Sequence, residues 1–250
     1  EGYGEFTGMN RDECREAVIK WFEEHDLLDH VEDLDHSVMH CYRCDAALEP
    51  WLSEQWFVAV DKLKGPALDA VNSGKVTFHP ARWTQTYTTW MENLKDWCIS
   101  RQRTWGVPIP AFYCKKCGTY HITDASIKAV SDLFRKEGSD AWYKYDANEI
   151  MPKTEVCECG ASDWEKDPDI MDVWFDSGST WSAVCRERPE LNWPADLYME
   201  GADQFRGWFQ SSLLTSVATQ GVAPYKGVLC HGWVVDEQGK QMHKSAGNGV

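Results

Sequence analysis

The closing loop of the sequence, residues 236–250 (DEQGKQMHKSAGNGV), combines residue types that suit phosphate binding. It follows the apolar run 228–235 and carries Lys244 and Ser245 between glycines. A lysine supplies a point charge, while a hydroxyl and backbone N–H groups supply directed hydrogen-bond donors to an anion. Glycine-, serine- and lysine-rich loops are more often simply solvated, so this pattern alone leaves both interpretations open.

Four cysteines form two short knuckles that suit a metal ion. Cys114 and Cys117 are spaced CxxC, Cys157 and Cys159 are spaced CxC, and a glycine follows each pair. Two such knuckles can bring four thiolates together around one tetrahedral zinc ion. The alternative is a set of loose thiols in the core. The pattern predicts a structural zinc site.

Cys41 and Cys44 form a third knuckle, which has no obvious second cysteine pair. His36 and His40 lie close enough in sequence to complete it, although histidines at such positions are more often ordinary surface or core residues. The remaining cysteines are expected to be small apolar core residues, and none has the setting of a nucleophile.

Several polar residues stand where a predicted strand gives way to a predicted helix. They are Glu200, Gly201, Asp203 and Gln204. Ligands of a parallel α/β sheet bind at the carboxyl ends of its strands, and this position is such an end. The plainer interpretation is a helix start, with Asp203 as the cap and Glu200 favoured by the helix dipole. His231 and Gly232 end the next apolar run and admit the same two interpretations.

The elements that must position these residues follow from hydrophobic periodicity and capping signals. Helices are expected after Asn10 and over 83–97, 124–138 and 203–220. Strands are expected over 54–58, 172–175, 196–199 and 228–235. Strand, helix and strand in this order indicate a βαβ unit, so the fold class is α/β with a parallel sheet.

The composition excludes some classes of protein. A formal net charge of −15 argues against non-specific nucleic-acid binding, although a local basic face for RNA stays open. No apolar stretch approaches the length of a membrane span, and no basic-then-apolar leader opens the sequence. Ten cysteines without a leader suggest a reducing, cytoplasmic location. The chain begins at Glu1 rather than Met, so we expect it to be a piece of a longer protein.

Two long segments and the closing loop resemble isoleucyl-tRNA synthetases of class I. They are DWCISRQRTWGVPIP at 96–110, LYMEGADQFRGWFQSS at 197–212, and a KMSKSxGN-like loop at 241–248. The resemblance implies the second half of a Rossmann-type catalytic domain with a zinc-knuckle insertion. The implied activity is ATP-dependent ligation of isoleucine to tRNA through an aminoacyl-adenylate. ATP, its Mg²⁺ counter-ion, isoleucine and tRNA are then the partners.

The resemblance also implies a role for each matching residue. Glu200, Gly201, Asp203 and Gln204 would bind the aminoacyl-adenylate, and Trp174 and Trp208 would wall the aliphatic side chain. A carboxylate suits the substrate ammonium, and indole faces suit a branched alkyl group. His231, Gly232 and Lys244 would bind ATP, with Lys244 and Ser245 catalytic. Without the resemblance, both tryptophans would be assigned to the core.

The same resemblance divides the chain into five parts. Residues 1–50 match the tail of the editing insertion with its CxxC hairpin, whose partner pair lies upstream in the family. Residues 51–112 and 167–235 match catalytic Rossmann segments, 113–166 a zinc-binding insertion, and 236–250 the KMSKS-like loop.

The sequence departs from the family in two ways. Gln241 and His243 stand where the family has lysine and serine, so one phosphate-directed charge is lost. The histidine-containing HIGH motif of the amino-terminal half is not in these residues, so the fragment alone is expected to be inactive and that half becomes an expected partner. Valyl-tRNA synthetase is the nearest alternative, since 49–57 and 90–96 resemble it more closely. A non-catalytic zinc-ribbon module that binds RNA or protein is the alternative from another class.

Overall fold

The computed structural model describes residues 4–41, 44–49 and 52–249. The chain divides into two compact units, Glu1–Ser53 and Glu54–Val250. No helix in the described part is both long and apolar enough to cross a bilayer.

The first unit contains one regular helix, α1 (Arg11–Glu24), preceded by a short 3₁₀ turn, η1 (Gly4–Phe6). Asn10 caps α1 as predicted, because its side chain accepts a hydrogen bond from the Asp12 backbone N–H. No residue of α1 is buried. An isolated bridge between His40 and Ala47 closes the hairpin that carries Cys41 and Cys44.

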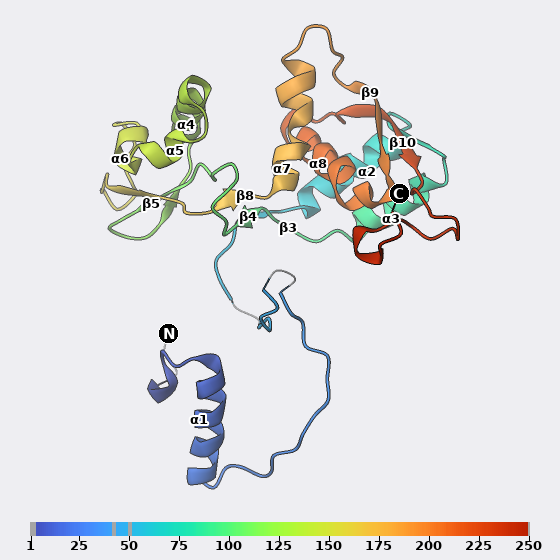
Figure 1. Cartoon of the computed structure of the whole chain (residues 1–250). Helices are drawn as coiled ribbons and strands as arrows, with labels where there is room; N and C mark the ends of the chain where they lie inside the picture. Colours follow the sequence, from blue (N-terminus) through green and yellow to red (C-terminus); the bar gives the residue numbers. More distant parts are fainter. Residues whose placement is uncertain (1–3, 42–43, 50–51, 250) are drawn as a thin grey trace. The chain divides into compact units, whose positions relative to one another are not determined.

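A parallel sheet organises the second unit (Figure 1). Its order is β2 (Thr77–His79), β10 (Tyr225–His231), β9 (Ala195–Gly201), and both pairings are parallel. The helices α2 (Asp61–Asn72), α3 (Trp83–Glu92) and α8 (Trp208–Gln220) supply the rest of one core. The predicted α/β class with a parallel sheet is therefore confirmed.

The βαβ unit β9–α8–β10 lies close to where the sequence placed it. Strand β9 contains the predicted 196–199 segment, and Gly221 ends α8 in a left-handed conformation with φ of 66°. Such a conformation favours glycine because it has no Cβ. The predicted helix 203–220 is divided, however: a 3₁₀ segment, η3 (Ala202–Arg206), precedes α8, and Gly207 stands between them.

The prediction of a buried strand over 172–175 is wrong. Asp172 is a helix cap instead: its carboxylate accepts a bond from the Trp174 backbone N–H and starts α7 (Val173–Gly178). A π-helical turn, η2 (Trp181–Arg186), follows. An aspartate before a short apolar run satisfies a helix start as well as a strand edge, and capping decides here.

Three other predicted elements were too long or shifted along the chain. The segment 54–58 yields only β1 (Phe57–Val58), which pairs antiparallel with β3 (Trp97–Cys98), and Phe57 is exposed rather than buried. The helix predicted over 83–97 ends at Glu92. The strand predicted over 228–235 begins and ends earlier, at Tyr225 and His231.

The four predicted metal-binding cysteines belong to a module with its own core. The helices of this module lie together in Figure 1. Its antiparallel sheet has the order β6 (Tyr120–His121), β5 (Phe112–Cys114), β7 (Trp164–Lys166). Its helices are α4 (Asp124–Glu137), α5 (Ala141–Lys144) and α6 (Ala147–Ile150). Helix α4 matches its prediction: Thr123 and Ser126 form a reciprocal cap, and Gly138 ends it. The short pair β4 (Ser100–Arg101) and β8 (Ile170–Met171) joins the module to the rest of the unit.

Candidate functional site

The carboxyl ends of β9 and β10 lie side by side. In the strand register, Cys230 is opposite Glu200 and His231 is opposite Gly201. The Glu200 side chain is partly buried, His231 is exposed, and the His231 Nδ1 atom lies 2.8 Å from the Gly232 carbonyl oxygen. The structure thus brings together two groups that the sequence had placed on separate strands, at the edge where α/β sheets bind ligands.

The turn after β9 is folded around the Gln204 side chain. Its carboxamide oxygen accepts a hydrogen bond of 2.8 Å from the Trp208 backbone N–H, and its nitrogen donates to the Asp203 carboxylate at 3.1 Å. Gln204 therefore satisfies a free donor at the start of α8, the task predicted for Asp203 in the helix-cap interpretation. Asp203 itself is exposed.

The two predicted tryptophans come from α7 and α8 and have different surroundings. Trp208 stacks on Tyr198, with ring centroids 4.0 Å apart and planes inclined by 11°. Its indole N–H donates to the Ser177 carbonyl oxygen at 3.0 Å, which ties α8 to α7. Trp174 is 40% exposed, and the edge of its six-membered ring lies against Gly207. Trp174 and Gln204 thus meet at one point of the backbone.

Asp172 is a buried hub that the sequence reasoning missed. Besides capping α7, its carboxylate accepts bonds of 2.9 Å from the Trp97 indole N–H and from the Arg101 guanidinium. One turn later, burial, with a smaller effect of the Asp172 charge, raises the pKa of Asp176 to about 6. The helix-start signal at Asp172 could have been found in the sequence, but its partners at 97 and 101 could not.

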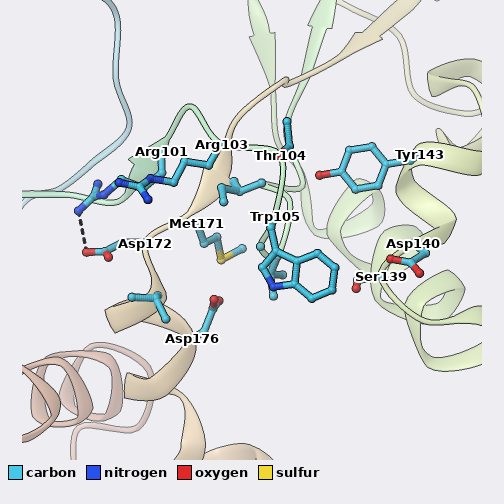
Figure 2. A pocket seen from close by; sticks show the side chains of 14 residues that line it. Arg101, Arg103, Thr104, Trp105, Ser139, Asp140, Tyr143, Met171, Asp172 and Asp176 are labelled. Atoms are coloured by element: carbon cyan, nitrogen blue, oxygen red, sulfur yellow. Dashed lines mark ion pairs between the residues drawn. The ribbon is translucent and has the colours of Figure 1, made fainter. Parts of the chain in front are cut away.

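A hollow of about 640 Å³ lies beside this hub, between the segment 101–107 and the 139–143 turn of the cysteine module (Figure 2). Arg101, Arg103, Trp105, Tyr143 and Asp176 are among the residues that line it. Trp105 is 91% exposed and Tyr143 is 59% exposed. The carboxylates of Asp140, Asp172 and Asp176 also line it, and the Arg101 guanidinium is paired with Asp172, so the two open aromatic faces and Arg103 are the groups free to meet a planar ligand. The sequence reasoning used 96–110 only as a resemblance and did not identify this hollow.

The closing loop has a defined internal structure around Asp236 and Asn248. The Asp236 carboxylate accepts bonds from the Asn248 amide at 2.7 Å and from the backbone N–H groups of Gln238 and Lys240. These bonds, with that from Asn248 the largest, lower the pKa of Asp236. Asn248 in turn accepts a bond from the His243 backbone N–H. Lys244, exposed, begins a 3₁₀ turn, η4 (Lys244–Ala246), which includes Ser245.

The four predicted cysteines of the module converge. The sulfur atoms of Cys114, Cys117, Cys157 and Cys159 all lie within 4.8 Å of one another. The Cys114–Cys159 and Cys117–Cys157 sulfur pairs are 3.6 and 3.5 Å apart. Four thiolates at about 2.3 Å from one zinc ion have edges of about 3.8 Å, so the arrangement fits a tetrahedral metal ion. Hydrogen bonding to Thr119 lowers the pKa of Cys117 to about 6, whereas, against a backbone hydrogen bond at Cys159 that lowers it, burial and the neighbouring thiols raise the pKa of Cys157 to about 12, so the sulfur geometry carries the assignment.

The third knuckle forms no such cluster within the described ranges. Cys41 is partly buried and Cys44 is exposed, and no third cysteine, histidine or carboxylate of the described residues completes a metal-binding group with them. His40 lies on Asp45 instead, with its Nδ1 atom 2.6 Å from the Asp45 carbonyl oxygen.

The chain is similar in sequence to known proteins. A profile of the family described as tRNA synthetases class I (I, L, M and V) matches residues 9–250. A relative named isoleucine--tRNA ligase, from Thermoanaerobacter sp. (strain X514), is 48% identical over 245 residues, which cover 98% of this chain and 26% of the relative. Its namesake from Carboxydothermus hydrogenoformans is 51% identical over 254 residues, which cover 100% of this chain and 27% of that protein. The chain spans about a quarter of the length of these curated relatives.

A solved structure shares the fold. It is Mycobacterium tuberculosis methionyl-tRNA synthetase bound by methionyl-adenylate, with a TM-score of 0.51 and 15% identity, over 86% of this chain and 33% of that one. The profile match over nearly the whole chain settles the relationship, so this chain belongs to the class I tRNA synthetases of the I, L, M and V group.

Proposed function

We propose that this chain forms the carboxyl-side part of the catalytic domain of an isoleucine–tRNA ligase. One observation carries the proposal: Glu200 and Gly201 lie beside His231 at the carboxyl edge of a parallel sheet, in a chain 48% and 51% identical to two proteins of that name. Those names do not favour the valyl alternative. The HIGH pattern is not in these 250 residues, so we expect the fragment by itself to be inactive.

The proposed reaction has two steps, formation of the aminoacyl-adenylate and transfer of the aminoacyl group to tRNA. The isoleucine carboxylate would attack the α-phosphorus of ATP, the bond from that phosphorus to the β-phosphate oxygen would break, and pyrophosphate would leave; Mg²⁺ would serve as the counter-ion of the phosphates. A terminal ribose hydroxyl of tRNA then attacks the acyl carbon, and AMP leaves. Both steps depend mainly on positioning and on stabilisation of phosphate charge. Lys244 and Ser245, in the loop held by Asp236 and Asn248, would stabilise the leaving pyrophosphate, and His231 with Gly232 would lie near the nucleotide.

The amino-acid slot would be built where β9, α7 and α8 meet. Glu200 offers a carboxylate to the substrate ammonium. Gln204 and Asp203 form a hydrogen-bonded pair that would orient the adenylate, and buried Gly201 lets Asp203 and Trp233 lie close to the backbone. Trp174 is exposed enough for its ring to face an alkyl group, whereas Trp208 is held by Tyr198 and Ser177 and would form the fixed wall.

An uncovered sheet face supports the proposed amino-terminal half of the catalytic domain as a partner. On β9, Tyr198 is buried against the core, whereas its neighbours Leu197 and Met199 are 48% and 58% exposed. Parallel sheets are normally covered on both faces, so an apolar exposed face suits another layer of protein. We infer that this layer completes a Rossmann-type domain.

The hollow beside Asp172 supports tRNA as the second macromolecular partner. Trp105 and Tyr143 supply open faces on which bases stack, and Arg103 supplies a positive charge that Asp140 and Asp176 partly offset. This local site is compatible with a chain whose net charge of −15 opposes non-specific RNA binding.

We further propose that the four converging cysteines hold a structural zinc ion. A closed set of four thiolates leaves no position for water or substrate, so the ion would stabilise the 113–166 insertion and take no part in the reaction. The two short sulfur–sulfur distances support this assignment.

Amino-acid-dependent ATP–pyrophosphate exchange tests the proposed function. Residues 9–250 would replace the matching segment of the Carboxydothermus relative, which is 51% identical, so that the rest of that enzyme is supplied. Exchange that depends on isoleucine, and that Glu200→Gln abolishes without lowering the melting temperature, is the expected result. Exchange that depends on valine would support the valyl alternative. A folded chimera with no exchange would refute a catalytic role.

A further inference from the structure

Gly207 occupies a point where no side chain fits. A Cβ atom built on it would lie 2.4 Å from the Gln204 carboxamide oxygen and 3.0 Å from both Cη2 and Cζ3 of Trp174. Contacts between carbon atoms are normally about 3.5–4.0 Å, so both neighbours would have to move.

The two neighbours differ in how they are held. Gln204 is fixed by its bonds to the Trp208 backbone N–H and to Asp203. A Cβ at 207 would push its carboxamide away from the Trp208 N–H and leave the start of α8 without that partner. Trp174 has its ring edge on Gly207, while 40% of the residue is open to solvent. Its ring can therefore yield only toward the open side.

We propose that Gly207 is a positioning residue that sets the width of the amino-acid slot. Its missing side chain lets the Trp174 indole lie back against the backbone while Gln204 stays folded over the same spot. A side chain at 207 narrows the slot from the Trp174 wall. This inference rests on the proposed function, since the open side of Trp174 is the slot only if the chain binds an aliphatic amino acid there.

A narrower slot penalises the larger of two homologous substrates. Isoleucine exceeds valine by one methylene, and one methylene in an apolar pocket changes discrimination by about 10- to 200-fold. Gly207→Ala should therefore lower kcat/KM for isoleucine by about tenfold more than kcat/KM for valine, mainly through KM. The KM for ATP should change by less than about twofold, since no phosphate-binding residue moves.

The experiment measures pyrophosphate exchange with isoleucine and valine in the chimeric enzyme that tests the proposed function. Gly65→Ala is the matched control, because a Cβ at this helical glycine meets nothing within 4 Å. The second variant is Gly207→Ala in a Trp174→Phe background. Phenylalanine lacks the outer ring atoms that the new Cβ would touch, so the effect of Gly207→Ala on the isoleucine-to-valine ratio should shrink there.

The outcomes separate the two proposals. An unsubstituted chimera that activates neither amino acid refutes the proposed function. The role of Gly207 is refuted by an active chimera in which Gly207→Ala leaves the isoleucine-to-valine ratio unchanged. It is refuted equally if Gly207→Ala changes that ratio by the same factor with and without Trp174→Phe. If Gly207→Ala does not fold, Trp174→Phe alone decides: a smaller ring against Gly207 should widen the slot and shift the isoleucine-to-valine ratio, and an unchanged ratio overturns the inference.

Discussion

Replacement of Cys159 by serine removes one of four sulfur atoms that lie within 4.8 Å of one another. Two sulfur pairs, at 3.5 and 3.6 Å, are within about 0.3 Å of the edge of a zinc–thiolate tetrahedron, and the other pairs are no more than 4.8 Å apart. Structural zinc sites contribute about 10–16 kcal/mol of apparent binding free energy, whereas a core in a domain of this size supplies about 3–5 kcal/mol. The metal, rather than the core, should therefore keep the module folded.

We expect one zinc per chain in protein purified without chelator, and a large loss of zinc in Cys159→Ser. Hydrogen exchange should speed up between β5 and β7, while β9, β10 and α8 stay protected. Cys185→Ser is the matched control, since Cys185 belongs to no metal-binding cluster of the described residues. This variant should retain one zinc per chain. Metal-free protein with all four thiols open to titration would refute the reasoning.

Two further predictions concern the pH dependence of stability and the closing loop. Burial raises the pKa of Asp176 to about 6, above its value of about 3.9 in an unfolded chain, so the native state holds this proton more tightly and loses stability as pH rises from about 4 through 6. Asp176→Asn should stabilise the chain by about 1 kcal/mol at pH 7.5 and by almost nothing at pH 4. The gain is modest because solvent screens the half-exposed carboxyl. Thermal unfolding at the two pH values checks this, and an equal gain at both would contradict it. Asn248→Ala removes the largest cause of the lowered pKa of Asp236 and should raise that pKa, speed hydrogen exchange over 236–249 and increase the KM for ATP, with little change in melting temperature. Asn192→Ala is its control, because it removes an exposed side-chain hydrogen bond to Asp196. Identical hydrogen exchange over 236–249 in both variants would show that the Asn248–Asp236 bond does not hold the loop.

Local signals predicted the elements whose ends are set by nearby residues. Helix α4 has a hydroxyl cap at Thr123 and a glycine at Gly138, and both lie where the sequence placed them. The segment 172–175 was predicted wrongly because a short apolar run after an aspartate suits a strand edge and a helix cap equally. The choice depends on Asp172 being buried with partners far along the chain, and periodicity carries no such information.

The candidate site was predictable only where residues identify it by type. Four cysteines at knuckle spacing can be found in any sequence, and they converge as predicted. The tryptophans could not be sorted this way, since 14 are present and residue type alone does not say which of them lie in the core. The hollow around Trp105 and Tyr143 needs two segments, 101–107 and 139–143, that pack together only in the folded chain. The roles of Glu200, Gln204 and the closing loop remain predictions.

Two buried aspartates decide how far the loss of metal can spread. Asp167 accepts a bond of 2.7 Å from the Trp56 indole N–H and one of 3.1 Å from the Tyr113 hydroxyl, and Asp172 accepts its bond from Trp97. They flank residues 168–171, the segment by which the chain leaves the cysteine module, which includes β8.

Backbone hydrogen bonds join this exit segment to residues 99–107, by which the chain enters the module. Met171 N–H donates to the Val107 carbonyl, and Asp172 N–H donates to the Ile99 carbonyl. Loss of the metal can disorder α7 only if these backbone hydrogen bonds break first, because α7 begins at the Asp172 cap. The two joined segments contain none of the four cysteines, and the buried carboxylate of Asp172 is bonded to Trp97 and Arg101, which lie outside the module. The insertion can therefore loosen while Trp174 keeps its place, which is why Cys159→Ser should leave the parallel sheet and its carboxyl edge intact.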